Sequence, residues 1–200
     1  MEPWHASIQD AYELLQGKKL EMQNYPMWEK ESLKDEQHPL AAYHVTEPFL
    51  LHTNKKEGES FKIEGRLLGG CLDCLSHLRG TKFDKVKEFN QKYEDDGILW
   101  FLESCDLNVF EMRRTLWSLK QAGWFDTCRG FLIGRPGVQG QIIAGLDQYE
   151  AVLSILSEFD VPIFMDLDIG HVAPMIPLIC GSYGKVTVVG NDCCIAMSLQ

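Results

Sequence analysis

The sequence has no hydrophobic run long enough to cross a bilayer. Its uninterrupted apolar stretches fall well short of the roughly 18 residues that a membrane-spanning helix needs. The first five residues, MEPWH, have neither the basic opening nor the apolar core of a signal peptide. We therefore expect a cytoplasmic protein without a membrane partner.

Basic residues are too few and too scattered for a protein that binds nucleic acid. The 200 residues include 29 acidic and 19 basic side chains, and the formal net charge is −10. No run of lysine or arginine is long enough to follow a phosphate backbone, so we expect no polyanionic partner. Hydrophobic residues make up 45% of the chain, which is ordinary for a globular protein, and the length allows one domain with its own core and an extension.

Cysteine is present without the pattern of a disulfide framework or a zinc finger. The seven cysteines are odd in number and scattered, and we expect them to be reduced. Cys71 and Cys74 form a single CxxC, which would serve as a redox pair or as half of a zinc site. No second CxxC or HxxxH lies at finger spacing, and the pair begins an amphipathic stretch. We therefore expect neither role, and no bound cofactor.

The stretch from Ile98 to Ser104 is the most informative part of the sequence. Five apolar residues, Ile-Leu-Trp-Phe-Leu, lead without a break to Glu103, and the turn signal Asp95-Asp96-Gly97 precedes them. Such a run is too short for an independent helix and predicts a strand buried on both faces. The tip of this strand therefore carries a carboxylate.

A second stretch, from Val161 to Pro174, has the same organisation and ends in a histidine. Val-Pro-Ile-Phe-Met leads to Asp166 and Asp168, and then to Gly170 and His171. The pattern predicts a second buried strand. An imidazole then follows this strand beside a glycine.

Glu103 and His171 together could serve three kinds of chemistry. One is a Ser–His–Glu relay, the second is a metal site completed by Asp166 and Asp168, and the third is a purely structural role for each residue. The two residues meet only if both strands end at one edge of a parallel sheet. We expect no metal, because His171 follows a glycine turn and need not join the face that the two aspartates share.

Residues 1–58 are expected to form a short helix followed by an extended interdomain arm. The helix begins near Ser7, with Asp10 in its first turn, and stops by Gly17. Residues 18–47 are polar and rich in charge, and thirty such residues are too many for a connection inside a compact domain. Trp28 in this arm is an aromatic anchor that either packs on its own domain or covers a substrate cleft.

Residues 59–200 alternate between strand and helix patterns. Such alternation, closed by an antiparallel hairpin around Gly190, predicts an α/β fold with a mixed sheet and flanking helices. The predicted elements are a strand at 61–67, helices at 71–78 and 84–93, a strand at 98–103, a helix capped at 108 and ended by 123, a strand at 129–134, a helix at 147–158, a strand at 161–167 and hairpin strands at 185–189 and 193–199.

Five short motifs in this region carry a family resemblance. Each is weak alone, but the ordered set with its spacing is specific. The motifs resemble the carboxy-terminal half of the LD-carboxypeptidase family, which includes the microcin C resistance peptidases, from about residue 59 to the end. They are Gly69-Gly70-Cys71-Leu72, Gly80-Thr81, Ile98-Leu-Trp-Phe-Leu-Glu103, Gly134-Arg135 and Gly170-His171-Val-Ala-Pro174.

The resemblance implies a fold, a reaction and a set of site residues. The fold would be a swivelling β/β/α carboxy-terminal domain in which Glu103 and His171 complete a Ser–His–Glu triad without metal. The enzyme would be a cytoplasmic serine peptidase that removes the terminal D-alanine of a murein tetrapeptide, with a microcin-type peptide conjugate as the alternative substrate. Trp28, Gly70 and Cys71 are the candidate substrate-binding residues, and the family's dimeric habit implies a homo-oligomer.

The chain departs from the family pattern in three ways. The family commonly has Gly-Gly-Asn where this chain has Cys71, and Leu-Glu-Asp where it has Ser104, and both changes bear on substrate preference more than on mechanism. The family's serine stands on a preceding α/β domain after a glycine at a sharp turn, and none of the ten serines here has that context. We therefore expect the nucleophile domain to be absent from this chain and the chain alone to be inactive. A non-catalytic peptide-binding module is the alternative.

Overall fold

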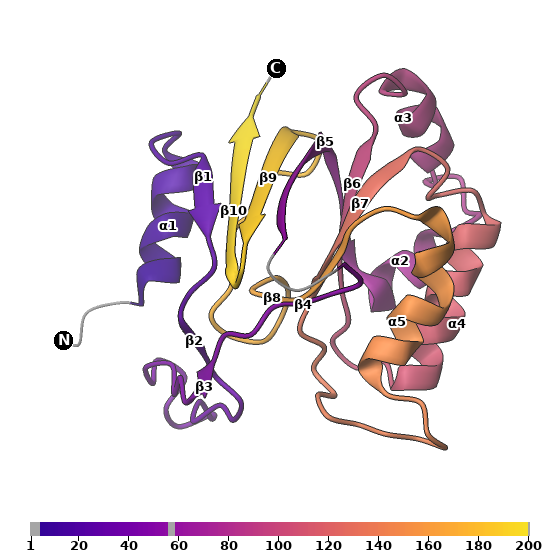
Figure 1. Cartoon of the computed structure of the whole chain (residues 1–200). Helices are drawn as coiled ribbons and strands as arrows, with labels where there is room; N and C mark the ends of the chain where they lie inside the picture. The colour runs from indigo at the N-terminus through magenta and orange to yellow at the C-terminus, as the bar shows by residue number, and fades with distance from the viewer. Residues whose placement is uncertain (1–4, 56–58, 200) are drawn as a thin grey trace.

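A computed structural model describes residues 5–55 and 59–199, and this part of the chain forms ten strands, five α-helices and one short 3-10 helix (Figure 1). In chain order these are α1 (Ala6–Leu15), β1 (Glu21–Gln23), β2 (Met27–Trp28), β3 (Glu47–Pro48), β4 (His52–Thr53), β5 (Ser60–Cys71), α2 (Leu72–Leu78), α3 (Val86–Lys92), β6 (Ile98–Glu103), α4 (Val109–Gln121), β7 (Cys128–Gly134), α5 (Gln148–Leu156), the 3-10 helix η1 (Ser157–Phe159), β8 (Ile163–Leu167), β9 (Tyr183–Val189) and β10 (Asp192–Ser198).

Eight of these strands form one mixed sheet in the order β1-β10-β9-β5-β6-β7-β8-β4, and β2 pairs with β3 separately. The four central strands, β5 to β8, run parallel. The strands on either side of them are antiparallel to their neighbours. The predicted α/β fold with a mixed sheet and flanking helices is therefore confirmed, and the tips of β6 and β8 lie at the same edge of the sheet.

Strand β6 divides the hydrophobic core into its two halves. Ile98, Trp100 and Leu102 point into the core that the sheet forms with α2 to α5, the helices grouped on one face in Figure 1. Leu99 and Phe101 point into the core on the opposite face. All but Phe101 are fully buried, so this strand is covered on both faces, as predicted from its unbroken apolar run.

Residues before position 59 help to build the second core. Met22, Tyr25 and Phe49 are buried there against the side chains of the main sheet, and two short strands of this region, β1 and β4, pair with that sheet. The predicted domain boundary between 58 and 59 adjoins residues 56–58, which lie outside the described part of the chain, and it stays a prediction.

The sequence indicated a starting residue for three helices, α1, α4 and α5, and in α4 and α5 that residue caps the helix. The Asn108 side chain accepts hydrogen bonds from the backbone of α4, as the predicted cap at 108 requires, and the Glu111 side chain accepts from the backbone N–H of Asn108, which completes a capping box. Asp147 caps α5 by accepting from the backbone N–H of Glu150. Helix α1 begins at Ala6, close to the expected start near Ser7, but its capping residue is His5, whose side chain accepts from the backbone N–H of Ser7.

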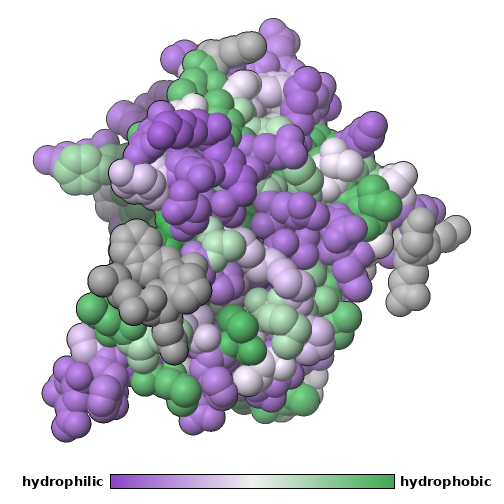
Figure 2. All heavy atoms as spheres, turned by 90° about the vertical axis from the view of Figure 1, so that its left-hand side faces the viewer, coloured by the Kyte–Doolittle hydropathy of each residue, from purple (hydrophilic) through white to green (hydrophobic). Residues whose placement is uncertain are grey.

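The face that carries α1 mixes hydrophilic and hydrophobic residues, with the hydrophobic ones in small separate groups (Figure 2). Helix α1 itself exposes Ile8, Tyr12 and Leu15, which share one side of the helix. No helix in residues 5–55 and 59–199 combines the length and the hydrophobicity needed to cross a membrane.

Candidate functional site

Glu103 is the last residue of β6, and its position follows from the alternation along that strand. It shares the strand face of Leu99 and Phe101, but it stands at the tip, where the apolar layer ends. Its side chain is only 5% exposed. Neighbouring strands and a turn after β8 therefore surround the carboxylate.

His171 reaches Glu103 through a turn that only glycine allows. Gly170 has φ +109, a region that favours glycine, and a Cβ there would lie 2.5 Å from Cγ of Glu103. A Cβ on Gly134, at the end of β7, would lie 1.9 Å from the carbonyl oxygen of Ile169. The two glycines let the turn after β8 approach both the tip of β7 and the Glu103 side chain.

The two predicted site residues are in direct contact. Nδ1 of His171 lies 2.9 Å from Oε2 of Glu103, and the His171 side chain is 56% exposed. The hydrogen bond to Glu103 raises the pKa of His171 above its ordinary value, against the opposing effect of partial burial. The carboxylate fixes one ring nitrogen and favours the protonated ring, which leaves Nε2 to exchange a proton at the surface.

Cys71 stands beside this pair. It is the last residue of β5 and lies opposite Glu103 in the parallel register of β5 and β6. Its sulfur lies 3.3 Å from Oδ2 of Asp73. Burial, followed by a hydrogen bond to Glu103, raises the pKa of Cys71 to about 12, so the group is a neutral thiol at physiological pH.

Gly70 precedes Cys71 at the same edge of the sheet. It has φ +143, and a Cβ added there would meet no atom within 4 Å. The neighbouring Gly69 is much more confined, since its Cβ would lie 1.7 Å from the carbonyl oxygen of Phe101. The glycine pair therefore combines close strand packing at Gly69 with open space at Gly70, next to the predicted site.

No serine completes a triad within the described residues. The one hydrogen-bond partner of the His171 ring there is Glu103. Ser104, the serine next to it in sequence, is buried and its hydroxyl has no partner within 5–55 and 59–199. The site thus contains a base and its orienting carboxylate.

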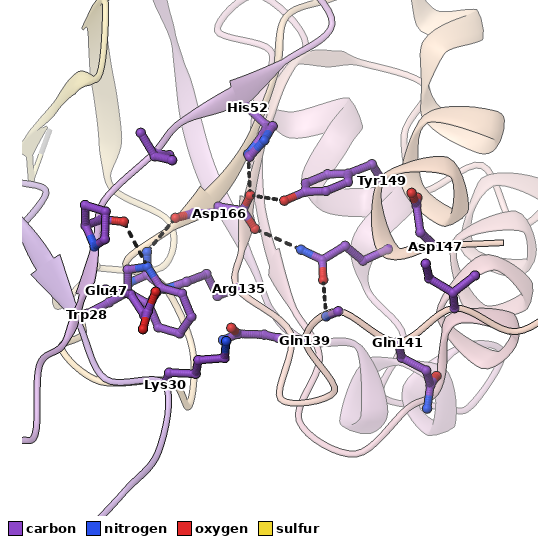
Figure 3. Close-up of a pocket in the computed structure, with 15 residues that line it drawn as sticks. Trp28, Lys30, Glu47, His52, Arg135, Gln139, Gln141, Asp147, Tyr149 and Asp166 are labelled. Atoms are coloured by element: carbon purple, nitrogen blue, oxygen red, sulfur yellow. Dashed lines mark hydrogen bonds and ion pairs between the residues drawn. The ribbon is translucent and has the colours of Figure 1, made fainter. Parts of the chain in front are cut away.

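Trp28 lies in a different place, a cavity of about 500 Å³ between the arm and the loop that leads to α5 (Figure 3). Its indole nitrogen donates to the carbonyl oxygen of Pro48 at 3.1 Å, and the guanidinium of Arg135 lies 5.2 Å from its ring. Neither Glu103 nor His171 lines this cavity. The indole therefore packs against the rest of the chain and borders a cavity. That Trp28 covers a substrate cleft stays a prediction.

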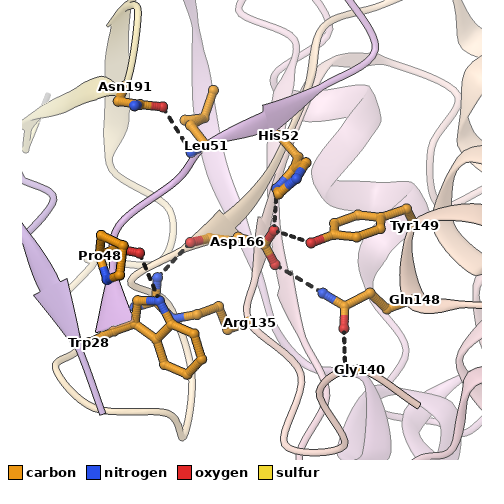
Figure 4. Close-up of polar contacts among 10 residues, drawn as sticks. All are labelled: Trp28, Pro48, Leu51, His52, Arg135, Gly140, Gln148, Tyr149, Asp166 and Asn191. Carbon is orange, nitrogen blue, oxygen red and sulfur yellow. Dashed lines mark hydrogen bonds and ion pairs between the residues drawn. The ribbon is translucent and has the colours of Figure 1, made fainter. Parts of the chain in front are cut away.

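Asp166 organises one wall of that cavity (Figure 4). Its carboxylate is contacted by Nδ1 of His52 at 2.6 Å, the hydroxyl of Tyr149 at 2.8 Å and Nε2 of Gln148 at 3.1 Å. Sequence reasoning missed this cluster, since His52 lies more than a hundred residues away on a two-residue strand with no recognisable pattern. Asp168 is engaged separately, by Arg135 and by the backbone N–H of Tyr25.

Comparisons with known proteins agree with this fold. Residues 64–186 match the sequence model described as the LD-carboxypeptidase C-terminal domain. The "Putative carboxypeptidase" of Treponema pallidum is 27% identical over 137 residues, which cover 68% of this chain and 37% of that protein.

Two solved structures share the fold. An MccF-like protein from Streptococcus pneumoniae, solved in complex with AMP, superposes with a TM-score of 0.69 at 23% identity, over 96% of this chain and 57% of its own. A muramoyltetrapeptide carboxypeptidase from Oxalobacter formigenes superposes with a TM-score of 0.65 at 16% identity, over 99% of this chain and 56% of its own.

This chain is thus much shorter than its relatives, spanning just over half of those two structures and 37% of the Treponema protein. The family match runs from the middle of β5 into β9 and includes Cys71, Glu103, Gly134 and His171. Because that match covers more than half of the chain, the chain belongs to the LD-carboxypeptidase C-terminal domain family.

Proposed function

We propose that this chain is the carboxy-terminal half of a serine-type LD-carboxypeptidase and supplies the glutamate and histidine of its Ser–His–Glu triad. The observation that carries the proposal is the 2.9 Å contact between His171 Nδ1 and Glu103 Oε2. A carboxylate that is 5% exposed and an imidazole that is 56% exposed form the arrangement that a hydrolytic relay requires, with the orienting group inside and the base at the surface.

In this proposal each residue has a distinct task. His171 takes the proton of the attacking serine on Nε2 and later gives it to the leaving amine, while Glu103 holds the ring by Nδ1 and stabilises the imidazolium. The hydroxyl comes from an amino-terminal nucleophile domain, as the family resemblance implies. The chain by itself is then inactive, because its base has no hydroxyl to activate.

The substrate we propose is a murein tetrapeptide, which loses its terminal D-amino acid. A microcin-type peptide conjugate is the second candidate, favoured by the fold shared with an MccF-like protein whose structure contains AMP. Gly70 and Cys71, at the sheet edge beside the triad, and Trp28, in the arm, are the proposed substrate contacts. We also propose that the protein is cytoplasmic and that it forms a homo-oligomer. Light scattering would test the oligomeric state.

The decisive experiment joins the chain to an LD-carboxypeptidase amino-terminal domain that carries the serine turn. Release of D-alanine from a murein tetrapeptide is measured for the chain alone, for the joined protein and for its variants. We expect no release from the chain alone. In the joined protein, His171→Ala should lower the rate by up to about 10⁶-fold and Glu103→Gln by up to about 10⁴-fold.

His77→Ala is the matched control, because His77 is exposed on α2 and should leave the rate unchanged. Full activity of the chain alone would mean that the nucleophile lies within it. Unchanged activity of His171→Ala would mean that another group is the base. Peptide binding without hydrolysis by a correctly folded joined protein would favour the non-catalytic binding module.

A further inference from the structure

We propose that Cys71, Glu103 and His171 form a binding site for a zinc-type divalent metal ion. The sulfur of Cys71, a carboxylate oxygen of Glu103 and a ring nitrogen of His171 all lie within 4.8 Å of one another. They come from the ends of two neighbouring strands, β5 and β6, and from the turn after β8. Three potential ligands thus converge from three segments that the fold holds together.

The three donor types suit zinc and its usual substitutes, cobalt and cadmium. Thiolate sulfur and imidazole nitrogen are the preferred zinc ligands, and carboxylate oxygen is the third common one. Cys71, Glu103 and His171 supply one ligand atom of each of these three kinds.

The distances require a small adjustment. Ligand atoms around a tetrahedral zinc ion are about 3.5 Å apart, and the three atoms here lie within 4.8 Å of one another, with Nδ1 of His171 2.9 Å from Oε2 of Glu103. Wider pairs therefore have to close by at most about 1.3 Å, and the contact between His171 and Glu103 has to open slightly. Cys71 and Glu103 are fixed as register partners on paired strands, whereas His171 is half-exposed and stands on a turn. Rotation of the imidazole accomplishes the closure, and the exposed side of His171 provides the entry path.

The charges of the site also balance. When the metal binds, the Cys71 thiol releases its proton to solvent and the sulfur coordinates as thiolate, and a protonated His171 ring likewise releases one proton so that its nitrogen can coordinate. A dipositive ion with one thiolate, one carboxylate and one neutral imidazole is electrically neutral, which suits a partly buried position. A water molecule completes the fourth position.

This proposal departs from the expectation, drawn from the sequence, that the chain binds no metal. The site also differs from the one weighed there, in which Asp166 and Asp168 were candidate partners of His171. The structure engages those two carboxylates elsewhere, Asp166 with His52 and Asp168 with Arg135. If the proposed function also holds, metal binding removes both members of the catalytic pair from use. The metal-bound form would then be an inhibited form of the peptidase.

The test is a titration of the reduced, chelator-treated chain with Co²⁺ as the spectroscopic probe. We expect saturation near one equivalent, with a sulfur-to-cobalt charge-transfer band in the near ultraviolet and the intense visible bands of a tetrahedral site. Zn²⁺ should then displace Co²⁺ and abolish both features. The measurement needs no substrate, so its failure would leave the peptidase proposal standing.

Cys71→Ser should abolish the charge-transfer band, and His171→Asn should weaken Co²⁺ binding at least about tenfold. Cys74→Ser and Cys180→Ser are matched controls, because both cysteines are exposed and should leave the band unchanged. Circular dichroism checks that each variant is folded.

Two results would overturn the proposal. One is the absence of a saturable band in the unaltered chain. The other is a band that persists in Cys71→Ser or falls equally in Cys74→Ser, which would indicate adventitious binding to thiols. If Cys71→Ser does not fold, the result for His171→Asn decides. An unchanged affinity of His171→Asn for Co²⁺ would refute the site.

Discussion

Gly170 lies so close to the side chain of Glu103 that a Cβ at position 170 would force one of the two to move. A Cβ at position 170 would lie 2.5 Å from Cγ and 2.6 Å from Oε2 of Glu103. The backbone there also has φ +109. The glycine therefore sets the distance between the buried carboxylate and His171, the next residue along the chain.

We predict that Gly170→Ala destabilises the fold by roughly 1–3 kcal/mol and separates Glu103 from His171, because the variant suffers both backbone strain and a clash. Urea unfolding measures the first effect, and NMR titration of His171 measures the second. Gly140→Ala is the matched control, since its φ is +68 but no atom lies within 4 Å of the added Cβ. An equal loss of stability in both variants would mean that strain alone acts at Gly170.

The hydrogen bond that His171 donates to Glu103 makes the protonation of His171 measurable. This bond raises the pKa of His171 above 6.5, partial burial opposes it, and the charges of Asp73 and Asp106 add to it. We predict a raised value by NMR in the unaltered chain and a lower one in Glu103→Gln. Asp35→Asn, which alters the exposed His38 pair instead, should leave the titration of His171 unchanged.

The same pair makes stability depend on pH in a defined direction. Because the folded-state pKa of His171 is the higher one, the pair stabilises the folded protein fully below pH 6.5. The pair's contribution to stability disappears as the pH rises through the folded-state pKa of His171. In Glu103→Gln, the free energy of unfolding should fall less steeply as the pH rises through this range. A fall as steep as that of the unaltered chain would count against a charged pair.

The hydroxyl of Tyr149 is predicted to contribute to stability through Asp166. It donates to that carboxylate at 2.8 Å, and Asp166 is only 9% exposed. Tyr149→Phe should therefore cost about 1–2 kcal/mol of unfolding free energy, because a charged acceptor loses a donor. Tyr12→Phe is the control, since Tyr12 is 56% exposed and its loss of a hydroxyl should cost close to nothing. Equal values for the two variants would show that His52 and Gln148 satisfy Asp166 without the phenol.

Much of the fold could be predicted because the central strands carry unmistakable patterns. The unbroken apolar run at 98–102 and its counterpart at 161–165 fix two buried parallel strands, and Asn108 with Glu111 fixes a helix start. The contact of Glu103 with His171 follows from those strands, since both end at one sheet edge.

Other features could not be predicted because they depend on contacts between distant segments. The strands β1 and β4 are two or three residues long and have no periodicity, so their pairing with the sheet depends on tertiary packing. The Asp166 cluster joins His52 to residues beyond 147 for the same reason. The proximity of Cys71 to Glu103 required the register of two parallel strands, which apolar patterns alone leave open.

The chemical reactivity of Cys71 separates the proposed serine mechanism from one in which this chain carries its own nucleophile. Burial and the hydrogen bond to Glu103 raise the pKa of its thiol to about 12, so at pH 8 only about one molecule in 10⁴ carries the thiolate. We predict that iodoacetamide, followed by peptide mass spectrometry over time, modifies Cys71 far more slowly than the exposed Cys74 and Cys180.

Glu103→Gln should accelerate modification of Cys71, because the carboxylate no longer disfavours the thiolate, and it should leave the rates at Cys74 and Cys180 unchanged. If Cys71 reacted instead as fast as the exposed cysteines, it would be an activated thiol beside an imidazole, which is the arrangement of a cysteine peptidase. The nucleophile would then lie in this chain, and the proposal that a serine must come from another domain would be wrong. A neutral Cys71 thiol should be modified slowly. Slow modification of Cys71, together with inactivity of the chain alone, would support a serine supplied by another domain.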